Sequence, residues 1–155
     1  QPAETLETVN ELLYSDAPEA MFITTVYAIL DPQAGKLVYA NAGHNLPLIL
    51  RKSTHTVERL HMGSIALGVI EDAKYKDDRV ILEPGDVILF YTDGLTETFS
   101  PAGEIFTEGR LIETLLESSP QSSRDLLDYL ETKIDQFRKG ESPSDDLTMI
   151  AVQRK

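Results

Sequence analysis

The sequence predicts an α+β fold in which two antiparallel sheets are stacked and helices cover their outer faces. Most predicted strands come early in the chain, and two helices follow before a last strand, an order typical of α+β proteins rather than of alternating βαβ units. Several strands are apolar on both faces or nearly so, such as residues 87–91 and 147–152. Antiparallel strands of this kind need cover on both sides, which stacked sheets with outer helices provide.

An N-terminal helix and a series of strands are predicted before residue 92. Apolar side chains recur at helical spacing between residues 3 and 14 and predict one buried face, formed by Leu6, Val9, Leu12 and Leu13. Residues 15–18 end this helix. Residues rich in β-branched and aromatic side chains predict strands at 22–30, 36–41, 46–50, 57–60, 79–82 and 87–91. The first two strands form a hairpin around a turn at 31–35.

Two helices and a final strand are predicted after residue 100. Thr107 is a candidate N-cap for a helix whose apolar residues are Leu111, Ile112, Leu115 and Leu116. Ser122 and Asp125 resemble a capping box for a second helix, which carries apolar residues from 126 to 137. Lys139 and Gly140 are a stop signal for that helix. A polar loop at 141–146 leads to the last strand at 147–152.

Composition limits the class of protein. A chain of 155 residues with 41% hydrophobic and 26% charged residues is typical of one soluble globular domain. The absence of cysteine excludes disulfides and thiolate sites. Fourteen basic against 26 acidic residues give a net charge of -12, which disfavours nucleic acid and anionic membranes as partners. No apolar run is long enough to span a bilayer and no signal peptide is apparent, so we expect a cytoplasmic protein.

The stretch 83–98 carries the most informative motif. A Pro-Gly-Asp turn precedes the apolar strand 87–91, and Asp93 followed by Gly94 comes at its end. A carboxylate held at the end of a rigid strand, with little side-chain bulk beside it, suits a metal or phosphoryl site. The alternative is an Asp-Gly turn that only leaves a core strand.

A second acidic feature, Asp145 and Asp146, directly precedes the last strand. Adjacent carboxylates repel each other, which is tolerable in water or when a cation neutralises them. Together with Asp93 they supply the oxygen ligands that Mg²⁺ and Mn²⁺ prefer. The sequence therefore predicts a metal site formed by Asp93, Asp145 and Asp146, and the alternative for the pair is a solvated loop.

Two further residues are candidates for supporting roles. Glu97 lies four residues after Asp93 and would support the metal ligands, or else is a surface residue that anchors a loop. His44, within the segment 41–47, would be a general acid or a ligand, and the alternative is a turn histidine bonded to the backbone.

Five motifs occur in order along the chain, at 21–25, 39–47, 67–69, 84–97 and 144–148. Together they resemble the SpoIIE-type (RsbU-like) branch of the metal-dependent type 2C serine/threonine protein phosphatases, over about residues 2–153. The resemblance implies a four-layer α/β/β/α sandwich with two Mn²⁺ or Mg²⁺ ions between its sheets. It also implies that a metal-activated water attacks the phosphorus of phosphoserine or phosphothreonine directly.

The resemblance also implies roles and partners. Asp93 and Asp145 match two metal ligands of the family, and Asp146 is the adjacent candidate. Gly94, Glu97 and His44 stay candidates for supporting roles. The implied substrate is a phosphorylated anti-sigma-factor antagonist, and the implied regulator is a sensor domain upstream of the phosphatase domain.

The front of the chain departs from the family pattern. The family's Asp-x-x-Gly-x-Gly segment, which carries the metal-bridging aspartate, has no match in residues 1–20. We therefore expect residues 1–155 to be a single phosphatase-type domain that is incomplete at its N-terminus and weakly active or inactive by itself. An exposed sheet edge would also favour a homodimer. The alternative function is a non-catalytic, phosphatase-like adaptor module in a signalling protein.

Overall fold

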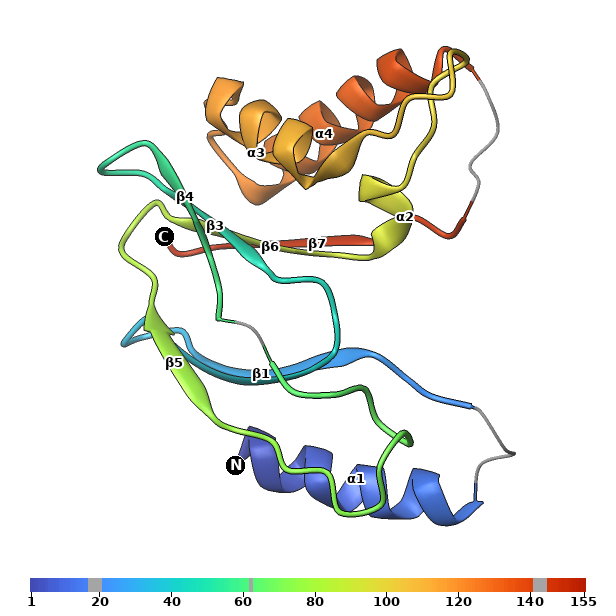
Figure 1. The fold of residues 1–155 in the computed structure, drawn as a ribbon. Coiled ribbons are helices and arrows are strands. Elements are labelled where there is room, and N and C mark those ends of the chain that lie inside the picture. The colour runs from blue at the N-terminus through green and yellow to red at the C-terminus, as the bar shows by residue number, and fades with distance from the viewer. Residues whose placement is uncertain (17–20, 62, 141–144) are drawn as a thin grey trace. The chain divides into compact units, whose positions relative to one another are not determined.

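The computed structural model describes residues 1–16, 21–61, 63–140 and 145–155. Within these ranges it contains four helices and seven strands, which form two antiparallel sheets (Figure 1). The chain divides into two compact units, of which unit 1 comprises Gln1–Leu46 and His61–Leu82, and unit 2 comprises Pro47–Leu60 and Glu83–Lys155. Two antiparallel sheets combined with helices confirm the predicted α+β class.

Unit 1 is a three-stranded sheet with one helix packed on it. Its strands are ordered β1-β2-β5, with bounds β1 (Thr25–Asp31), β2 (Lys36–Ala42) and β5 (Asp78–Ile81). Asp31 closes the β1–β2 hairpin, because its carboxylate accepts the backbone N–H groups of Gln33 and Ala34, each at 3.0 Å. Helix α1 (Pro2–Asp16) packs against β1 and β2.

The predicted apolar face of α1 is partly wrong. Leu6 is buried, but Val9 is 36% exposed and Leu12 is 60% exposed. A polar residue, Asn10, takes the central buried position instead and is 1% exposed. Its amide nitrogen donates to the carbonyls of Ile70 and Glu71, both at 2.9 Å. The helix is therefore held to the loop before β5 by hydrogen bonds, which hydrophobic spacing does not reveal.

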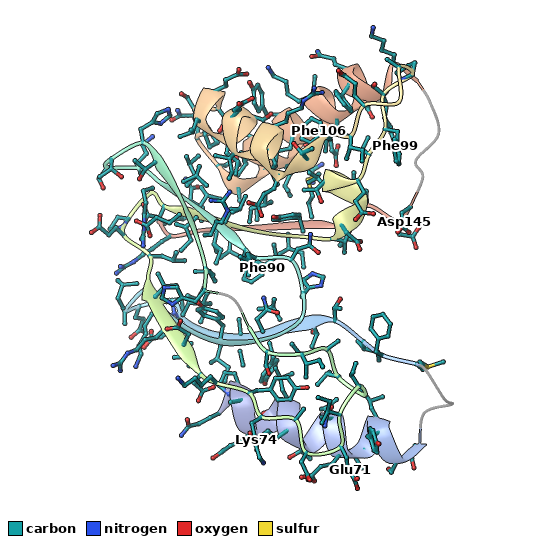
Figure 2. All side chains as sticks on the ribbon, in the orientation of Figure 1. Glu71, Lys74, Phe90, Phe99, Phe106 and Asp145 are labelled. Atoms are coloured by element: carbon teal, nitrogen blue, oxygen red, sulfur yellow. The ribbon has the colours of Figure 1, made fainter. Side chains whose placement is uncertain are left out.

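Unit 2 is a four-stranded sheet covered by helices on one face. The strand order is β4-β3-β6-β7, with bounds β3 (Leu48–Arg51), β4 (Thr56–Arg59), β6 (Val87–Tyr91) and β7 (Met149–Gln153). Alternate residues of β6, namely Val87, Leu89 and Tyr91, share a buried cluster with apolar residues of the two long helices. These helices are α3 (Thr107–Glu117) and α4 (Ser123–Arg138). Phe106, just before α3 (labelled in Figure 2), packs edge-on against Phe137 with ring centroids 5.2 Å apart.

The predicted start and end of α4 are confirmed. The hydroxyl oxygen of Ser122 accepts the backbone N–H of Asp125 at 3.1 Å, as an N-cap does. At the other end Lys139 adopts a left-handed conformation with φ of 50°. The start of α3 differs from a standard cap, since Thr107 is the first helical residue and has φ of 66°. Its hydroxyl nevertheless accepts the N–H of Arg110 at 3.5 Å.

Two elements were not predicted from the sequence. The first is the short helix α2 (Asp93–Thr96), which directly follows β6. The second is a small hairpin between α2 and α3, in which Phe99 pairs with Ile105. Of the helix end predicted at residues 15–18, Ser15 and Asp16 are still helical, and residues 17 and 18 lie outside the described residues. The first four residues of the predicted loop at 141–146 lie outside them as well. Over the ranges that are described, none of the helices combines the length and the hydropathy that a bilayer-spanning helix requires.

Candidate metal centre

Strand β6 is the rigid element that carries the site. It pairs with β3 on one side and β7 on the other, so its backbone is hydrogen-bonded along both edges. Val87, Ile88 and Leu89 are each at most 2% exposed. The backbone that leads to Asp93, two residues after this strand, therefore begins from a fixed place, as a metal ligand requires.

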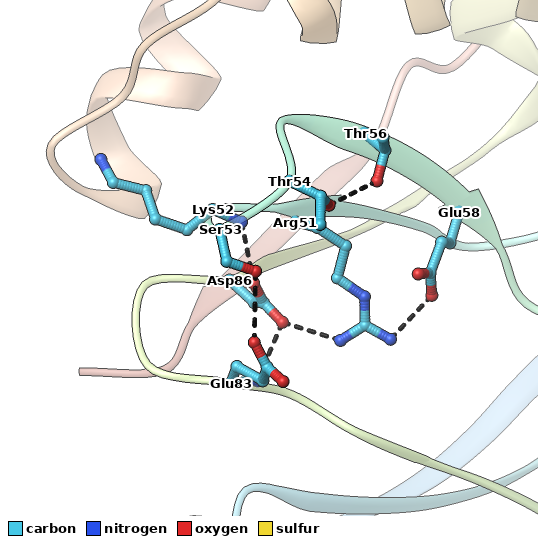
Figure 3. A network of polar contacts seen from close by, with 8 residues as sticks. All are labelled: Arg51, Lys52, Ser53, Thr54, Thr56, Glu58, Glu83 and Asp86. Carbon is cyan, nitrogen blue, oxygen red and sulfur yellow. Dashed lines mark hydrogen bonds and ion pairs between the residues drawn. The ribbon is translucent and has the colours of Figure 1, made fainter.

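A buried carboxylate fixes the start of β6. Asp86 is fully buried, and its carboxylate accepts bonds from the Lys52 N–H at 2.9 Å, the Arg51 guanidinium at 2.7 Å and the Glu83 N–H at 2.8 Å (Figure 3). Burial by itself raises the pKa of Asp86, but the hydrogen bonds from Lys52, Arg51 and Glu83 outweigh it and hold the pKa below its usual value. Arg51 also bridges to Glu58 at 2.7 Å.

At the other end of β6, Thr92 ties two distant segments together. Its hydroxyl donates to the carbonyl of Asp146 at 3.0 Å and accepts the N–H of Thr148 at 3.0 Å. Its own N–H donates to the carbonyl of Thr148 at 3.1 Å. The segment 146–148 is therefore bound to the end of β6 by three hydrogen bonds that all involve Thr92.

Gly94 permits an even closer approach at the same place. A Cβ atom at this position would lie 2.5 Å from the carbonyl oxygen of Asp146 and 2.9 Å from its carbonyl carbon, distances that no side chain tolerates without a shift of the backbone. The glycine predicted as a supporting residue thus has a steric role, since it lets α2 lie directly against the segment that contains Asp145 and Asp146.

The three predicted carboxylates are all exposed and all belong to unit 2. One carboxylate oxygen of Asp93 accepts the N–H of Gly94 at 3.0 Å, and one of Asp145 accepts the N–H of Asp146 at 2.7 Å. Asp145 lies beside α2 (Figure 2). The structure therefore brings the backbone of Asp93 close to the backbone of the Asp145–Asp146 pair. Within the described residues, each of the three carboxylates keeps an oxygen atom that is not hydrogen-bonded.

The chemistry of these donors fits a hard divalent cation. Mg²⁺ and Mn²⁺ prefer carboxylate oxygen and are often held by only one or two carboxylates together with waters. Within the four described ranges, no group of three or more histidine, aspartate or glutamate side chains is arranged to hold a metal ion. The oxygen atoms of Asp93, Asp145 and Asp146 are of the kind that Mg²⁺ or Mn²⁺ takes as ligands, and their role as metal ligands stays a prediction.

The remaining predicted residues are placed as follows. Glu97 is exposed directly after α2, and its N–H donates to the carbonyl of Asp93 at 2.7 Å. His44 belongs to unit 1, where its ring Nδ1 lies 3.0 Å from the Thr24 hydroxyl. The side chain of Asn41 bonds both the N–H and the carbonyl of His44, so the backbone of this turn is held by a side chain. The supporting roles of Glu97 and His44 stay predictions.

Sequence reasoning missed Thr92. Its only signal is a hydroxyl residue between an apolar strand and an Asp-Gly pair, and threonine is also frequent in ordinary strands. Thr92 joins residues 54 and 56 positions away, so only the tertiary structure reveals the contact.

Comparison with known proteins places this chain in a family. The family model for Stage II sporulation protein E (SpoIIE) matches residues 1–155. Protein IcfG of Synechocystis sp. is 34% identical over 135 residues, which cover 87% of this chain and 21% of IcfG. The phosphoserine phosphatase RsbU of Bacillus subtilis is 29% identical over 159 residues, which cover 99% of this chain and 45% of RsbU. The chain thus spans less than half the length of these relatives.

Solved structures show the same fold. The PP2C (type 2C) phosphatase domain of SpoIIE from Bacillus subtilis, solved with a fragment of its regulatory domain, superposes with a TM-score of 0.82 at 18% identity, over 99% of this chain and 45% of that one. The SiaA-PP2C domain of Pseudomonas aeruginosa gives 0.81 at 19% identity, over 98% and 60%. A manganese-presoaked structure of the SpoIIE phosphatase domain gives 0.70 at 16% identity, over 99% and 66%. The predicted type 2C phosphatase fold is therefore confirmed.

Proposed function

This chain belongs to the Stage II sporulation protein E family, and on that premise we propose that it is the metal-dependent serine/threonine phosphatase domain of a bacterial signalling protein. One observation carries the proposal: Thr92 and Gly94 hold Asp93 and the Asp145–Asp146 pair together at the ends of two paired strands. A phosphatase of this kind needs carboxylates on backbone segments that are held in fixed places in order to bind its metal.

Each residue of the site has a definite task in this proposal. Asp93 and Asp145 would hold Mn²⁺ or Mg²⁺ through their carboxylates, and Asp146 is the adjacent candidate. Thr92 and Gly94 would fix the distance between the segment that contains Asp93 and the segment that contains Asp145 and Asp146. When bound, the metal would activate a water as the nucleophile and neutralise the charge of the phosphoryl oxygens.

The substrate we propose is a protein that carries phosphoserine or phosphothreonine, of the anti-sigma-factor-antagonist type. Support comes from RsbU, which is named a phosphoserine phosphatase. A regulatory or sensor domain in the same protein would control the activity, in line with the regulatory domain that the SpoIIE structure is named for. We propose the cytoplasm as the place of the reaction.

Phosphate release from a phosphoserine protein tests the proposal. The natural protein that contains these 155 residues is assayed with Mn²⁺, with Mg²⁺ and with a chelator. We expect hydrolysis that needs the metal and that falls by at least about a hundredfold in Asp93→Asn, because a lost ligand misplaces the reacting groups. Undiminished turnover in Asp93→Asn would contradict the mechanism.

A second candidate function is a phosphatase-like binding module without catalysis. The observation in its favour is that no group of three carboxylate or histidine side chains forms a metal cluster among the described residues. The same assay separates the two functions, since an adaptor would bind a phosphoprotein and release no phosphate with any metal.

A further inference from the structure

The hairpin between α2 and α3, residues 98–106, exposes two large apolar side chains next to each other. Phe99 is 47% exposed and Ile105 is 43% exposed, and they face each other across an antiparallel bridge. Paired residues of neighbouring strands lie on one face, so the two form one continuous apolar surface. We call residues 98–106 the apolar hairpin.

The base of the apolar hairpin is anchored in the core of unit 2. The Thr98 hydroxyl, which is buried, donates to the carbonyl of Gly94 at 2.7 Å. The N–H of Phe106 donates to the carbonyl of Thr98 at 2.9 Å. Phe106 itself is 4% exposed and belongs to the main apolar cluster. A surface held this firmly loses little conformational entropy when a partner binds to it.

The tip of the apolar hairpin is also ordered by its own hydrogen bonds. The N–H of Ser100 donates to the carbonyl of Glu104 at 2.8 Å, and the N–H of Gly103 donates to the carbonyl of Ser100 at 2.9 Å. Gly103 has φ of 79°, a conformation that favours glycine. Phe99 and Ile105 are thus presented on a closed turn rather than on a loose loop.

The apolar hairpin is continuous with the candidate metal centre. The hydroxyl of Thr98 is hydrogen-bonded to the carbonyl of Gly94. Gly94 directly follows Asp93 in sequence and lies against the backbone of Asp146. In Figure 2 the side chains of Phe99 and Asp145 lie on the same side of unit 2. A molecule whose phosphate reaches Asp93 and Asp145 therefore comes close to Phe99 and Ile105.

Charge narrows the kind of molecule that this surface binds. The chain has a net charge of -12. Exposed Glu97 lies two residues before Phe99, and Glu104, next to Ile105, is paired with Arg110 at 3.3 Å. The net charge of the chain therefore opposes a phosphorylated partner at long range, and the apolar pair beside the site supplies attraction without charge. A small phosphate ester has no apolar surface large enough to use both side chains, whereas a folded protein has.

We propose that the apolar hairpin is the docking surface for the phosphoprotein substrate, which contacts Phe99 and Ile105 through an apolar patch beside its phosphorylated residue. The inference rests on the proposed phosphatase function and adds to it a site of substrate selection. It separates recognition of the protein, by Phe99 and Ile105, from reaction with its phosphate at Asp93 and Asp145.

Two substrates compared in one variant test this inference. The natural protein that contains these residues is assayed with Mn²⁺ on a serine-phosphorylated anti-sigma-factor antagonist from the same organism and on p-nitrophenyl phosphate. In the double variant Phe99→Ala, Ile105→Ala we expect KM for the phosphoprotein to rise about ten- to hundredfold, the change expected when apolar side chains that binding would bury are removed. Its kcat, and kcat/KM for p-nitrophenyl phosphate, stay unchanged.

Matched variants identify the cause. Ile29→Ala removes a side chain that is 49% exposed on β1 in unit 1, and it should leave both substrates unaffected. Phe99→Leu keeps an apolar side chain and should restore most of the phosphoprotein affinity. Circular dichroism establishes that each variant is folded.

Three results would overturn the proposal. They are an equal loss on both substrates, an unchanged KM for the phosphoprotein, and a change of oligomeric state in the double variant, which would assign the surface to a second copy of the chain. Calorimetric binding of the phosphoprotein gives an independent reading. If wild-type protein binds it and the double variant does not, the docking surface stands even where no phosphate is released, and only the phosphatase function fails.

Discussion

Gly94 is the residue at which the geometry of the site is most restricted. The carbonyl oxygen of Asp146 occupies the space that a side chain would need. Asp-Gly pairs are common in turns because glycine adopts unusual backbone angles. Here the reason is different, since the glycine permits the close approach of two segments that are more than fifty residues apart in sequence.

Replacement of Gly94 by alanine should therefore disturb the site. The new Cβ would meet the Asp146 carbonyl at 2.5 Å, and the segment that carries Asp145 would have to move. We expect metal-dependent hydrolysis to fall about ten- to hundredfold, with a loss of stability of about 1–3 kcal/mol from overpacking. Phosphate release and urea unfolding measure the two effects.

Gly109→Ala is the matched control for that change. A Cβ at Gly109, within α3, would meet only the Thr107 hydroxyl, at 3.7 Å. Activity should stay unchanged and stability should rise by about 0.5–1 kcal/mol. If Gly94→Ala behaves like Gly109→Ala, the close approach at Asp146 does not position the metal ligands.

Asp86 is the residue that makes the start of β6 dependent on pH. Its pKa in the folded protein is lowered because the hydrogen bonds from Lys52, Arg51 and Glu83 outweigh the effect of burial. The unfolded chain has an ordinary value of about 3.9, so it binds more protons than the folded protein does in that range. The stabilisation from Asp86 is therefore complete above about pH 4 and is lost as the pH falls through the lower, folded value.

We predict that Asp86→Ala destabilises the protein by about 3 kcal/mol at neutral pH, because it leaves buried donors without their acceptor. Glu58→Ala is the control, since it removes a 52% exposed partner of the same arginine, and it should cost less than about 1 kcal/mol. Urea unfolding between pH 3 and 7 should also show a smaller acid loss for Asp86→Ala than for wild type. An equal loss of stability in the two variants would show that Asp86 does not stabilise the start of β6.

The elements differ in how far the sequence determines them. Strand β6 and helix α4 were predicted because each carries its own signals, an apolar run after a Pro-Gly-Asp turn and a capped helical stripe that ends at Lys139. Helix α2 and the apolar hairpin were missed because they are short and are held by tertiary bonds, such as the bond from Thr98 to Gly94. The buried face of α1 was misassigned because Asn10 replaces an apolar residue at its centre.

The N-cap of α4 gives a prediction at this scale. The Ser122 hydroxyl accepts the N–H of Asp125, so Ser122→Ala leaves that donor unpaired and should cost about 1 kcal/mol of stability. Ser123→Ala changes the neighbouring serine, which is the first helical residue, and should cost almost nothing. Thermal unfolding compares the two variants, and an equal effect at both positions would contradict the cap.

For the molecule as a whole, the sequence predicts which residues are candidate ligands but not which residues hold their two segments together. Asp93 and Asp145 were recognised from residue type and from the order of motifs along the chain. Thr92 and the Asp146 contact of Gly94 were not, because both join segments that are distant in sequence. A sequence motif indicates which residue types could bind a metal. The hydrogen bonds and close contacts that hold two distant motifs together are seen only in the folded structure.

The acidic character of the whole chain gives the site its context. A net charge of -12 favours divalent cations near the surface and opposes anionic partners. Any single Asp→Asn change would therefore weaken metal binding slightly through net charge alone. A test of the ligands has to separate this general effect from direct coordination.

The affinity for Mn²⁺ tests the central claim, that Asp93 and Asp145 hold the same metal centre. Paramagnetic resonance of free Mn²⁺ gives the dissociation constant for the natural protein and for Asp93→Asn, Asp145→Asn, their double variant and the exposed control Asp72→Asn. We predict at least about a tenfold loss for each ligand variant, a double variant little worse than either single one, and almost no loss for the control. Wild-type affinity in Asp93→Asn, or losses that simply add, would contradict the account.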